Sequence, residues 1–133
     1  SYNEGVYVAD WMLEQGITVC VVKYRLPNGH CKVPHSDVEN AFRYCRANAE
    51  GWGVKQIGVI GFSAGGHLAA TASTLWTDEV TRPDFSILIY PVITLTPGTT
   101  HHGTHKNLLG EGNMMKEKYM DRYSLQNRFR YRI

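Results

Sequence analysis

The feature that most constrains this sequence is a serine flanked by glycines, placed between a β-branched run and a run of small residues. It lies in the hexapeptide Gly61-Phe62-Ser63-Ala64-Gly65-Gly66. Residues 56–62 before it predict a strand, and residues 64–75 after it predict a helix. A chain that passes directly from strand to helix at a serine must turn sharply in a strained conformation. Glycines two positions before and after remove side chains that would clash there.

This turn has a definite chemical use. It lifts the Ser63 hydroxyl above the strand ends, where the N-terminus of the following helix favours developing negative charge. The Ala64 backbone N–H is placed to stabilise an oxyanion. The alternatives are a glycine-rich turn without catalysis or a phosphate-binding loop, but neither GxGxxG nor a GK[ST] ending is present. We predict Ser63 as nucleophile, Ala64 as oxyanion donor, and Gly61, Gly65 and Gly66 as structural residues of the turn.

Helices and strands alternate through the first two thirds of the chain. We expect a helix that Asn3 caps and Gly16 ends, then a strand over residues 17–24 that is covered on both faces. A capping box, Ser36-Asp37-Val38-Glu39, predicts the start of the next helix. A further strand is expected over residues 85–93. Strands separated by helices of this length imply crossover connections and a parallel sheet, which is the α/β fold class.

Composition excludes several classes of protein. The chain has 133 residues, 43% hydrophobic and 20% charged, which suits one globular domain. The net charge of +2 is too weak to suggest nucleic acid as the main partner. No run approaches the roughly 18–20 apolar residues of a membrane span. The three cysteines have no CxxC spacing, so they predict neither a disulfide framework nor a zinc site.

Other residues that could carry chemistry have simpler interpretations. The cluster of His101, His102 and His105 lies among turn residues without an acidic or cysteine ligand, so we expect a solvated loop and no metal. His67 follows Ser63 by four residues and is directed along the helix, so we expect it to be structural. The acidic residues after this helix should be solvated caps at the opposite edge of the sheet; they are Asp78, Glu79 and Asp84.

Several blocks of sequence resemble the α/β-hydrolases, in particular the bacterial esterase group that includes acetyl-xylan and feruloyl esterases. They are Gly16-Ile17-Thr18, the run from Lys23 to His30, the run from Gly61 to Ala69, Arg82-Pro83-Asp84-Phe85 with Tyr90-Pro91-Val92, and the run from Lys106 to Gly110. The similarity covers roughly residues 1–127. It implies ester hydrolysis by Ser63 without a metal or organic cofactor, on a small-molecule or carbohydrate acyl ester.

The resemblance also implies parts that this sequence does not show. Members of the group carry a His-Gly-Gly-Gly-like loop before the nucleophile, and the triad Asp or Glu and His on loops after two later strands. We therefore expect a partial α/β-hydrolase fold that is incomplete at both ends. Residues 1–112 would form the central part of the domain, and residues 113–133 a short helix with an irregular basic tail. The compartment and the oligomeric state are not predicted.

Three functions remain open from the sequence. The first is a serine esterase that deacylates polysaccharide or small acyl esters. An arylformamidase or a lipase on the same scaffold is the second, because the fold does not fix the substrate. The third is a truncated non-catalytic remnant or binding protein. Because the triad Asp and His have no predicted scaffold, we expect the isolated 133-residue chain to be nearly inactive.

Overall fold

A crossover unit of strand, helix and strand forms the centre of the molecule. The computed structural model describes residues 2–93 and Leu125. Its elements in chain order are α1 (Tyr2–Glu14), α2 (Lys32–Asn48), β1 (Val59–Phe62), α3 (Ser63–Thr74) and β2 (Ser86–Ile89). The two strands pair in parallel, with Val59 opposite Ser86 and Phe62 opposite Ile89. The predicted α/β class with parallel strands and flanking helices is confirmed, although both strands are shorter than expected.

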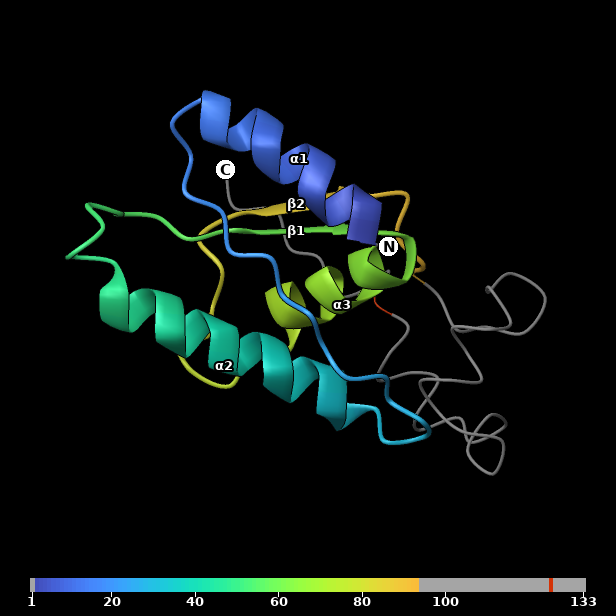
Figure 1. Cartoon of the computed structure of the whole chain (residues 1–133). Helices are drawn as coiled ribbons and strands as arrows, with labels where there is room; N and C mark the ends of the chain where they lie inside the picture. The colour runs from blue at the N-terminus through green and yellow to red at the C-terminus, as the bar shows by residue number, and fades with distance from the viewer. Residues whose placement is uncertain (1, 94–124, 126–133) are drawn as a thin grey trace.

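The helices are arranged in layers around the two strands. Figure 1 shows α3 and then α2 on one side of the strands, and α1 on the other. The core lies between α2 and α3, where Val38 and Phe42 of α2 meet Leu68 and Ala72 of α3. These side chains recur at helical spacing, so each helix buries one face. The apolar face of α2 is thus the one that packs on α3.

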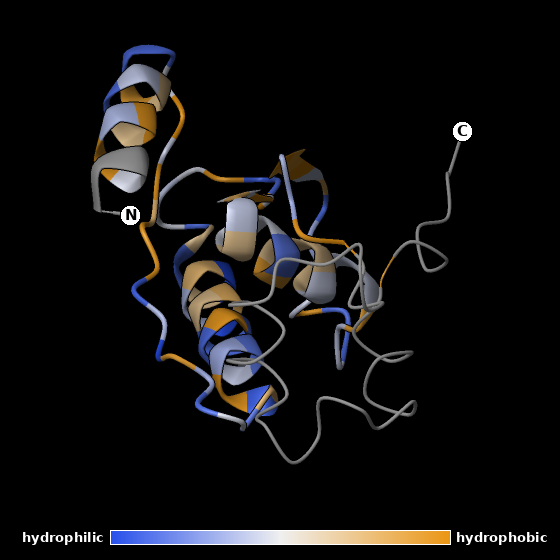
Figure 2. Ribbon diagram, turned by 90° about the vertical axis from the view of Figure 1, so that its right-hand side faces the viewer, coloured by the Kyte–Doolittle hydropathy of each residue, from blue (hydrophilic) through white to orange (hydrophobic). Residues whose placement is uncertain are grey.

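The strand expected over residues 17–24 is not formed. The segment has no ladder partner in the described part of the chain, and the side chains of Ile17 and Val21 are 47% and 60% exposed. The apolar character of this segment stands out in Figure 2, where much of it is orange. A β-branched sequence favours a strand only when a neighbouring backbone accepts its hydrogen bonds. The prediction failed because that neighbour is not among the described residues.

Both predicted N-caps were also wrong. α1 begins at Tyr2, so Asn3 lies inside the helix, although Gly16 has the positive φ of 76° expected of a helix stop. α2 begins at Lys32, before the predicted capping box. Pro34 is compatible with the first turn of a helix, where its missing N–H has no partner to lose. Ser36 therefore lies inside α2 and donates to the carbonyl of Val33 at 2.8 Å.

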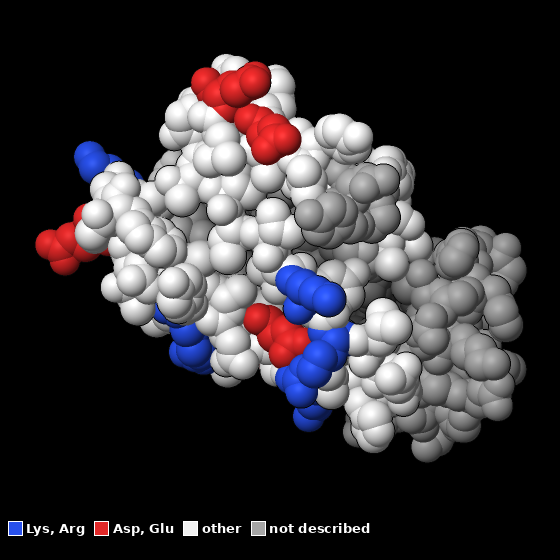
Figure 3. All heavy atoms as spheres, viewed as in Figure 1, with Lys and Arg blue, Asp and Glu red and all other residues white. Residues whose placement is uncertain are grey.

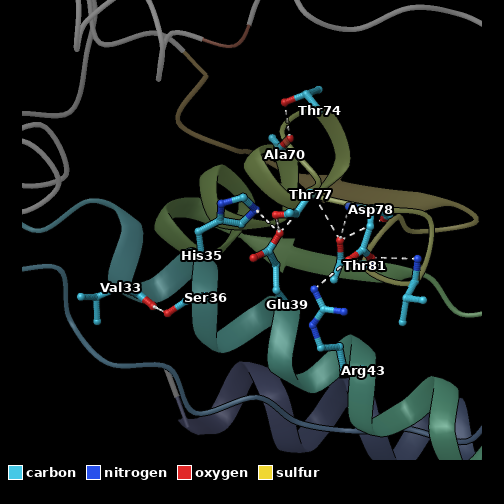
Figure 4. Close-up of polar contacts among 11 residues, drawn as sticks. Val33, His35, Ser36, Glu39, Arg43, Ala70, Thr74, Thr77, Asp78 and Thr81 are labelled. Carbon is cyan, nitrogen blue, oxygen red and sulfur yellow. Dashed lines mark hydrogen bonds and ion pairs between the residues drawn. The ribbon is translucent and has the colours of Figure 1, made fainter.

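A polar network joins α2 to the loop that follows α3 (Figure 4). Arg43 donates to Asp78 at 2.8 Å, and Glu39 accepts from the hydroxyl of Thr77. Asp78 also accepts from the backbone N–H of Thr81 at 3.1 Å. Arg43 lowers the pKa of Asp78, with help from the Thr81 N–H. Asp78 was predicted to be a solvated cap, but its hydrogen bonds to Arg43 and Thr81 hold this loop against α2.

Asp84 holds the amino ends of the two strands together. Its carboxylate accepts from the Ile57 backbone N–H at 2.7 Å and from Arg46 of α2 at 2.9 Å. Its own N–H donates to the carbonyl of Ile57 at 2.8 Å. Burial acts to raise its pKa, but the Arg46 and Ile57 hydrogen bonds and the nearby guanidinium charges outweigh burial, so the pKa lies below its usual value. Asp84 lies at the edge of the sheet opposite Ser63, as predicted, but it is hydrogen-bonded to Arg46 and Ile57 and is not a solvated cap.

Some predictions fall outside the described residues. They include the His101, His102 and His105 loop and the division of the chain at residue 112. Leu125 is described: it is fully buried, and its N–H donates to the carbonyl of Ile93 at 2.8 Å. Within the described part, no helix combines the length and the apolar character needed to cross a membrane.

Asp84→Asn should lower the free energy of unfolding at pH 7 by about 1 kcal/mol, because a charged hydrogen bond to Arg46 is replaced by a neutral one at a partly exposed site. A carboxylate with a lowered folded pKa stabilises the protein above its usual pKa, and this contribution is lost as the pH falls through the folded value. The difference between the two proteins should therefore shrink below the ordinary aspartate value of 3.8.

Urea unfolding across an acid pH series measures this difference. Glu79→Gln is the matched control, because it removes a carboxylate that pairs with Arg82 while its side chain is 75% exposed. Exposed pairs of this kind contribute little to stability. A constant difference between Asp84→Asn and the unsubstituted protein at all pH values would contradict the prediction.

Candidate active site

Ser63 lies at a sharp junction between β1 and α3. Phe62 is still extended, with φ −116° and ψ 136°, and Ser63 is already the first residue of the helix. Ser63 has a φ of 51°, a region that residues with a Cβ rarely adopt. Its side chain is exposed at the carboxyl end of the strand. The strained turn predicted from the sequence is present.

Two of the three glycines around Ser63 are required by close approaches. A Cβ on Gly61 would overlap the Gly65 carbonyl oxygen and lie 2.9 Å from the Cβ of Ala69. A Cβ on Gly66 would lie 2.9 Å from the Cβ of Pro91, which follows β2. At Gly65 the nearest atom would be the Tyr24 hydroxyl at 3.7 Å, an ordinary contact. The steric need expected at position 65 is therefore not found among the described residues.

The start of α3 can stabilise negative charge beside Ser63. The first N–H groups of a helix have no partner within the helix, and α3 has no side-chain cap. The Ala64 N–H belongs to this first turn, and the helix dipole adds positive potential there. Residues 56–76 contain no Asp, Glu, Lys or Arg, and neither do residues 85–93. These two segments therefore add no fixed charge to the potential of the helix dipole.

His67 fastens the start of α3 to the segment after β2. Its side chain is 3% exposed, and its Nδ1 lies 2.6 Å from the Val92 carbonyl oxygen. Because a carbonyl only accepts, Nδ1 carries the proton. The Val92 N–H in turn donates to the Ser63 carbonyl at 3.4 Å. Burial lowers the pKa of His67, and the Val92 contact only partly opposes this effect. The imidazole does not contact the Ser63 hydroxyl, in agreement with its predicted structural role.

Catalytic partners of Ser63 are not found in the described part of the chain. No hydrogen bond joins its hydroxyl to a histidine or a carboxylate there. Asp84 binds Ile57, at the opposite end of the sheet from Ser63. No group of three or more metal-binding side chains occurs among residues 2–93 and Leu125. The described residues thus supply a candidate nucleophile and a candidate oxyanion donor, and no base is found among them.

Sequence reasoning missed Tyr90, which lies beside Ser63. The register pairs Phe62 with Ile89, the last residues of two adjacent parallel strands, so Ser63 and Tyr90 are the residues that directly follow the paired strand ends. Tyr90 also has a positive φ, 35°, and its ring packs against Phe62 with the centroids 6.0 Å apart. The only local signal was an aromatic residue before a proline at the end of a strand.

Charged side chains of both signs lie on the face drawn in Figure 3. Basic and acidic side chains lie together in its lower part, and further acidic side chains lie apart from them at the top. Arg25 and Asp37 form an ion pair, with their Nη2 and Oδ1 atoms 2.7 Å apart. Arg25 lowers the pKa of Asp37 mainly through this hydrogen bond.

His67 gives the fold a specific pH dependence. A lowered folded pKa means that the unfolded state binds a proton first, so stability falls as the pH drops below the ordinary value of 6.5. His67→Asn keeps a donor near Val92 but does not titrate, and should show a flatter decline between pH 7 and pH 5. His67→Leu should be less stable than His67→Asn by about 1 kcal/mol at pH 7, because the Val92 carbonyl loses its donor. Urea unfolding measures both effects, and equal pH slopes for His67→Asn and the unsubstituted protein would contradict this account.

Comparison with known proteins agrees with this geometry. A family model described as the alpha/beta hydrolase fold matches residues 7–128. An acetylxylan esterase of Xylanibacter ruminicola is 43% identical over 96% of this chain, and endo-1,4-beta-xylanase B of Butyrivibrio fibrisolvens is 35% identical over 59% of it. The crystal structure of an acetyl ester-xyloside bifunctional hydrolase from Caldicellulosiruptor lactoaceticus covers 97% of the chain with 34% identity and a TM-score of 0.86.

The chain spans only part of each of these relatives. It covers 27% of the acetylxylan esterase, 14% of the xylanase and 51% of the solved hydrolase chain. The family match nevertheless covers most of the chain and includes the whole β1–α3–β2 unit with the strained serine. The chain belongs to the α/β-hydrolase family.

Proposed function

We propose that this chain carries the nucleophile of a serine esterase, and that Ser63 is that nucleophile. The observation that supports this most is the conformation of Ser63. A residue with a Cβ is held at a φ of 51°, exposed, at the first position of α3. Backbone strain of this kind costs on the order of 1–3 kcal/mol and persists only where the surrounding structure enforces it. The close packing of α3 on β1, which the missing side chain of Gly61 permits, holds Ser63 in this strained conformation.

The proposed reaction follows from this geometry. The Ser63 hydroxyl attacks the ester carbonyl and transfers its proton to a histidine base that is not among the described residues. The Ala64 N–H, at the open start of α3, donates to the oxyanion of the tetrahedral intermediate. As the intermediate collapses, the protonated histidine gives its proton to the departing alcohol and leaves an acyl-serine. Water then attacks the acyl-serine and gives a proton to the same histidine, which returns it to the Ser63 oxygen as the carboxylic acid departs. No step requires a metal or an organic cofactor.

An acylated carbohydrate is the substrate class that we propose. One relative is named an acetylxylan esterase and another an acetyl ester-xyloside bifunctional hydrolase, and a shared fold does not by itself fix the substrate. An arylformamidase or a lipase remains the alternative within the same mechanism. Acetyl release from an acetylated xylo-oligosaccharide, compared with hydrolysis of a long-chain acyl ester and of an N-formyl aromatic amine, distinguishes the three.

Ser63→Ala should reduce the turnover of p-nitrophenyl acetate by about 10⁴–10⁶-fold in the protein expressed from the complete gene, because the covalent step is lost. The fold should be unchanged, since the Ser63 side chain is exposed. Ser73→Ala is the matched control: it changes a serine of the same helix whose hydroxyl donates to the Ala69 carbonyl. Activity that survives in Ser63→Ala would exclude Ser63 as nucleophile.

The 133-residue chain expressed alone tests the non-catalytic alternative. Because the described residues place no base beside Ser63, we expect it to hydrolyse p-nitrophenyl acetate less than about a hundredfold faster than its own Ser63→Ala variant. A fluorophosphonate probe, which reacts with activated serines, should label the product of the complete gene and leave the 133-residue chain unlabelled. Strong labelling of the short chain at Ser63 would show that a base lies within it.

A further inference from the structure

Tyr90 has a conformation that its own sequence disfavours. A φ of 35° is strained for an aromatic residue, and the residue before a proline is restricted to extended conformations. The contacts of the next two residues hold this turn in place. Pro91 packs against Gly66, and Val92 bonds to both Ser63 and His67. Strain maintained in this way clusters at ligand-binding and active sites.

The Tyr90 side chain is not needed for the core. It is 65% exposed, although the backbone beside it is firmly held. One part of its ring packs against Phe62, the residue before Ser63, with an angle of 59° between the ring planes. This contact holds an exposed aromatic ring against the residue that precedes the serine. A rigid aromatic ring of this kind offers contact area at a small cost in conformational entropy.

We propose that Tyr90 is a substrate-contacting residue, whose ring forms a platform for the sugar that carries the acyl group cleaved at Ser63. This inference rests on the proposed function and extends it to a specificity residue. Sugar rings present C–H groups on their faces, which pack on aromatic rings. The described segment around Tyr90 also suits a neutral ligand, because residues 85–93 carry no Asp, Glu, Lys or Arg.

Two substrates test the proposal in the protein expressed from the complete gene. Tyr90→Ala should raise the KM for an acetylated xylo-oligosaccharide by about tenfold, which corresponds to the loss of one aromatic contact. It should leave kcat/KM for p-nitrophenyl acetate within about threefold, since that ester carries no sugar. Tyr90→Phe should retain the KM for both. Tyr44→Ala is the matched control, because Tyr44 is a 60% exposed tyrosine on α2 that packs on Trp52.

A second variant separates the ring from the backbone. Tyr90→Gly removes the ring and also relieves the positive φ, so it should match Tyr90→Ala on the acetylated sugar if the ring makes the contact. If Tyr90 only stabilises the turn, both substrates should be affected alike. An equal loss on both substrates, or an unchanged KM on the sugar, would overturn the proposal.

Binding of an unacetylated xylo-oligosaccharide to the Ser63→Ala protein, measured by calorimetry, tests Tyr90 independently of catalysis. Adding Tyr90→Ala should weaken this binding by about tenfold. The proposal that Tyr90 contacts the sugar would be contradicted by equal affinities in the two proteins, or by no measurable binding to the Ser63→Ala protein. If the proposed esterase function itself is wrong, the result differs: hydrolysis survives in Ser63→Ala, or the unsubstituted protein shows no hydrolysis.

Discussion

The close approach of α3 to β1 at Gly61 is the constraint on which the rest of the described structure depends. With hydrogen in place of a side chain, the helix can begin at the residue after the strand and fold back against it. That reversal sets the direction of α3. The direction determines which face of α3 meets Val38 and Phe42 of α2 and which residues meet Pro91. A methyl group at position 61 would force these packed layers apart, because close-packed interiors have little room to adjust.

The sequence was most informative where the local signals were sufficient by themselves. The β1–α3–β2 unit was predicted because glycines, small residues and apolar runs each favour the conformation that they adopt. The segment over residues 17–24 has equally strong β propensity, but its conformation depends on a neighbouring strand that local sequence does not reveal. The capping box failed for a related reason, because Pro34 allowed α2 to begin earlier and Ser36 then bonded within the helix.

The candidate site was predictable to a similar extent. Ser63 and Gly61 follow from one motif, since its residue types admit few other conformations. Tyr90 does not, because local preference opposes its conformation: aromatic residues and residues before proline both avoid a positive φ. Tertiary contacts of Pro91 and Val92 overcome that preference. At this edge of the sheet, sequence reasoning missed Tyr90 because tertiary contacts, and not its own local preference, determine its conformation.

The two ends of the strand pair are held by different forces, and this difference bears on the chemistry. Ion pairing secures the amino ends, where Asp84 joins Arg46 and Ile57. The carboxyl ends are secured by close packing, a backbone hydrogen bond and the neutral imidazole of His67. Fixed charges near Ser63 would add to or oppose the potential of the first turn of α3. The β1–α3–β2 contacts that hold this edge bring no such charge, and the first N–H groups of α3 form a preorganised dipole that needs no rearrangement when negative charge develops beside it.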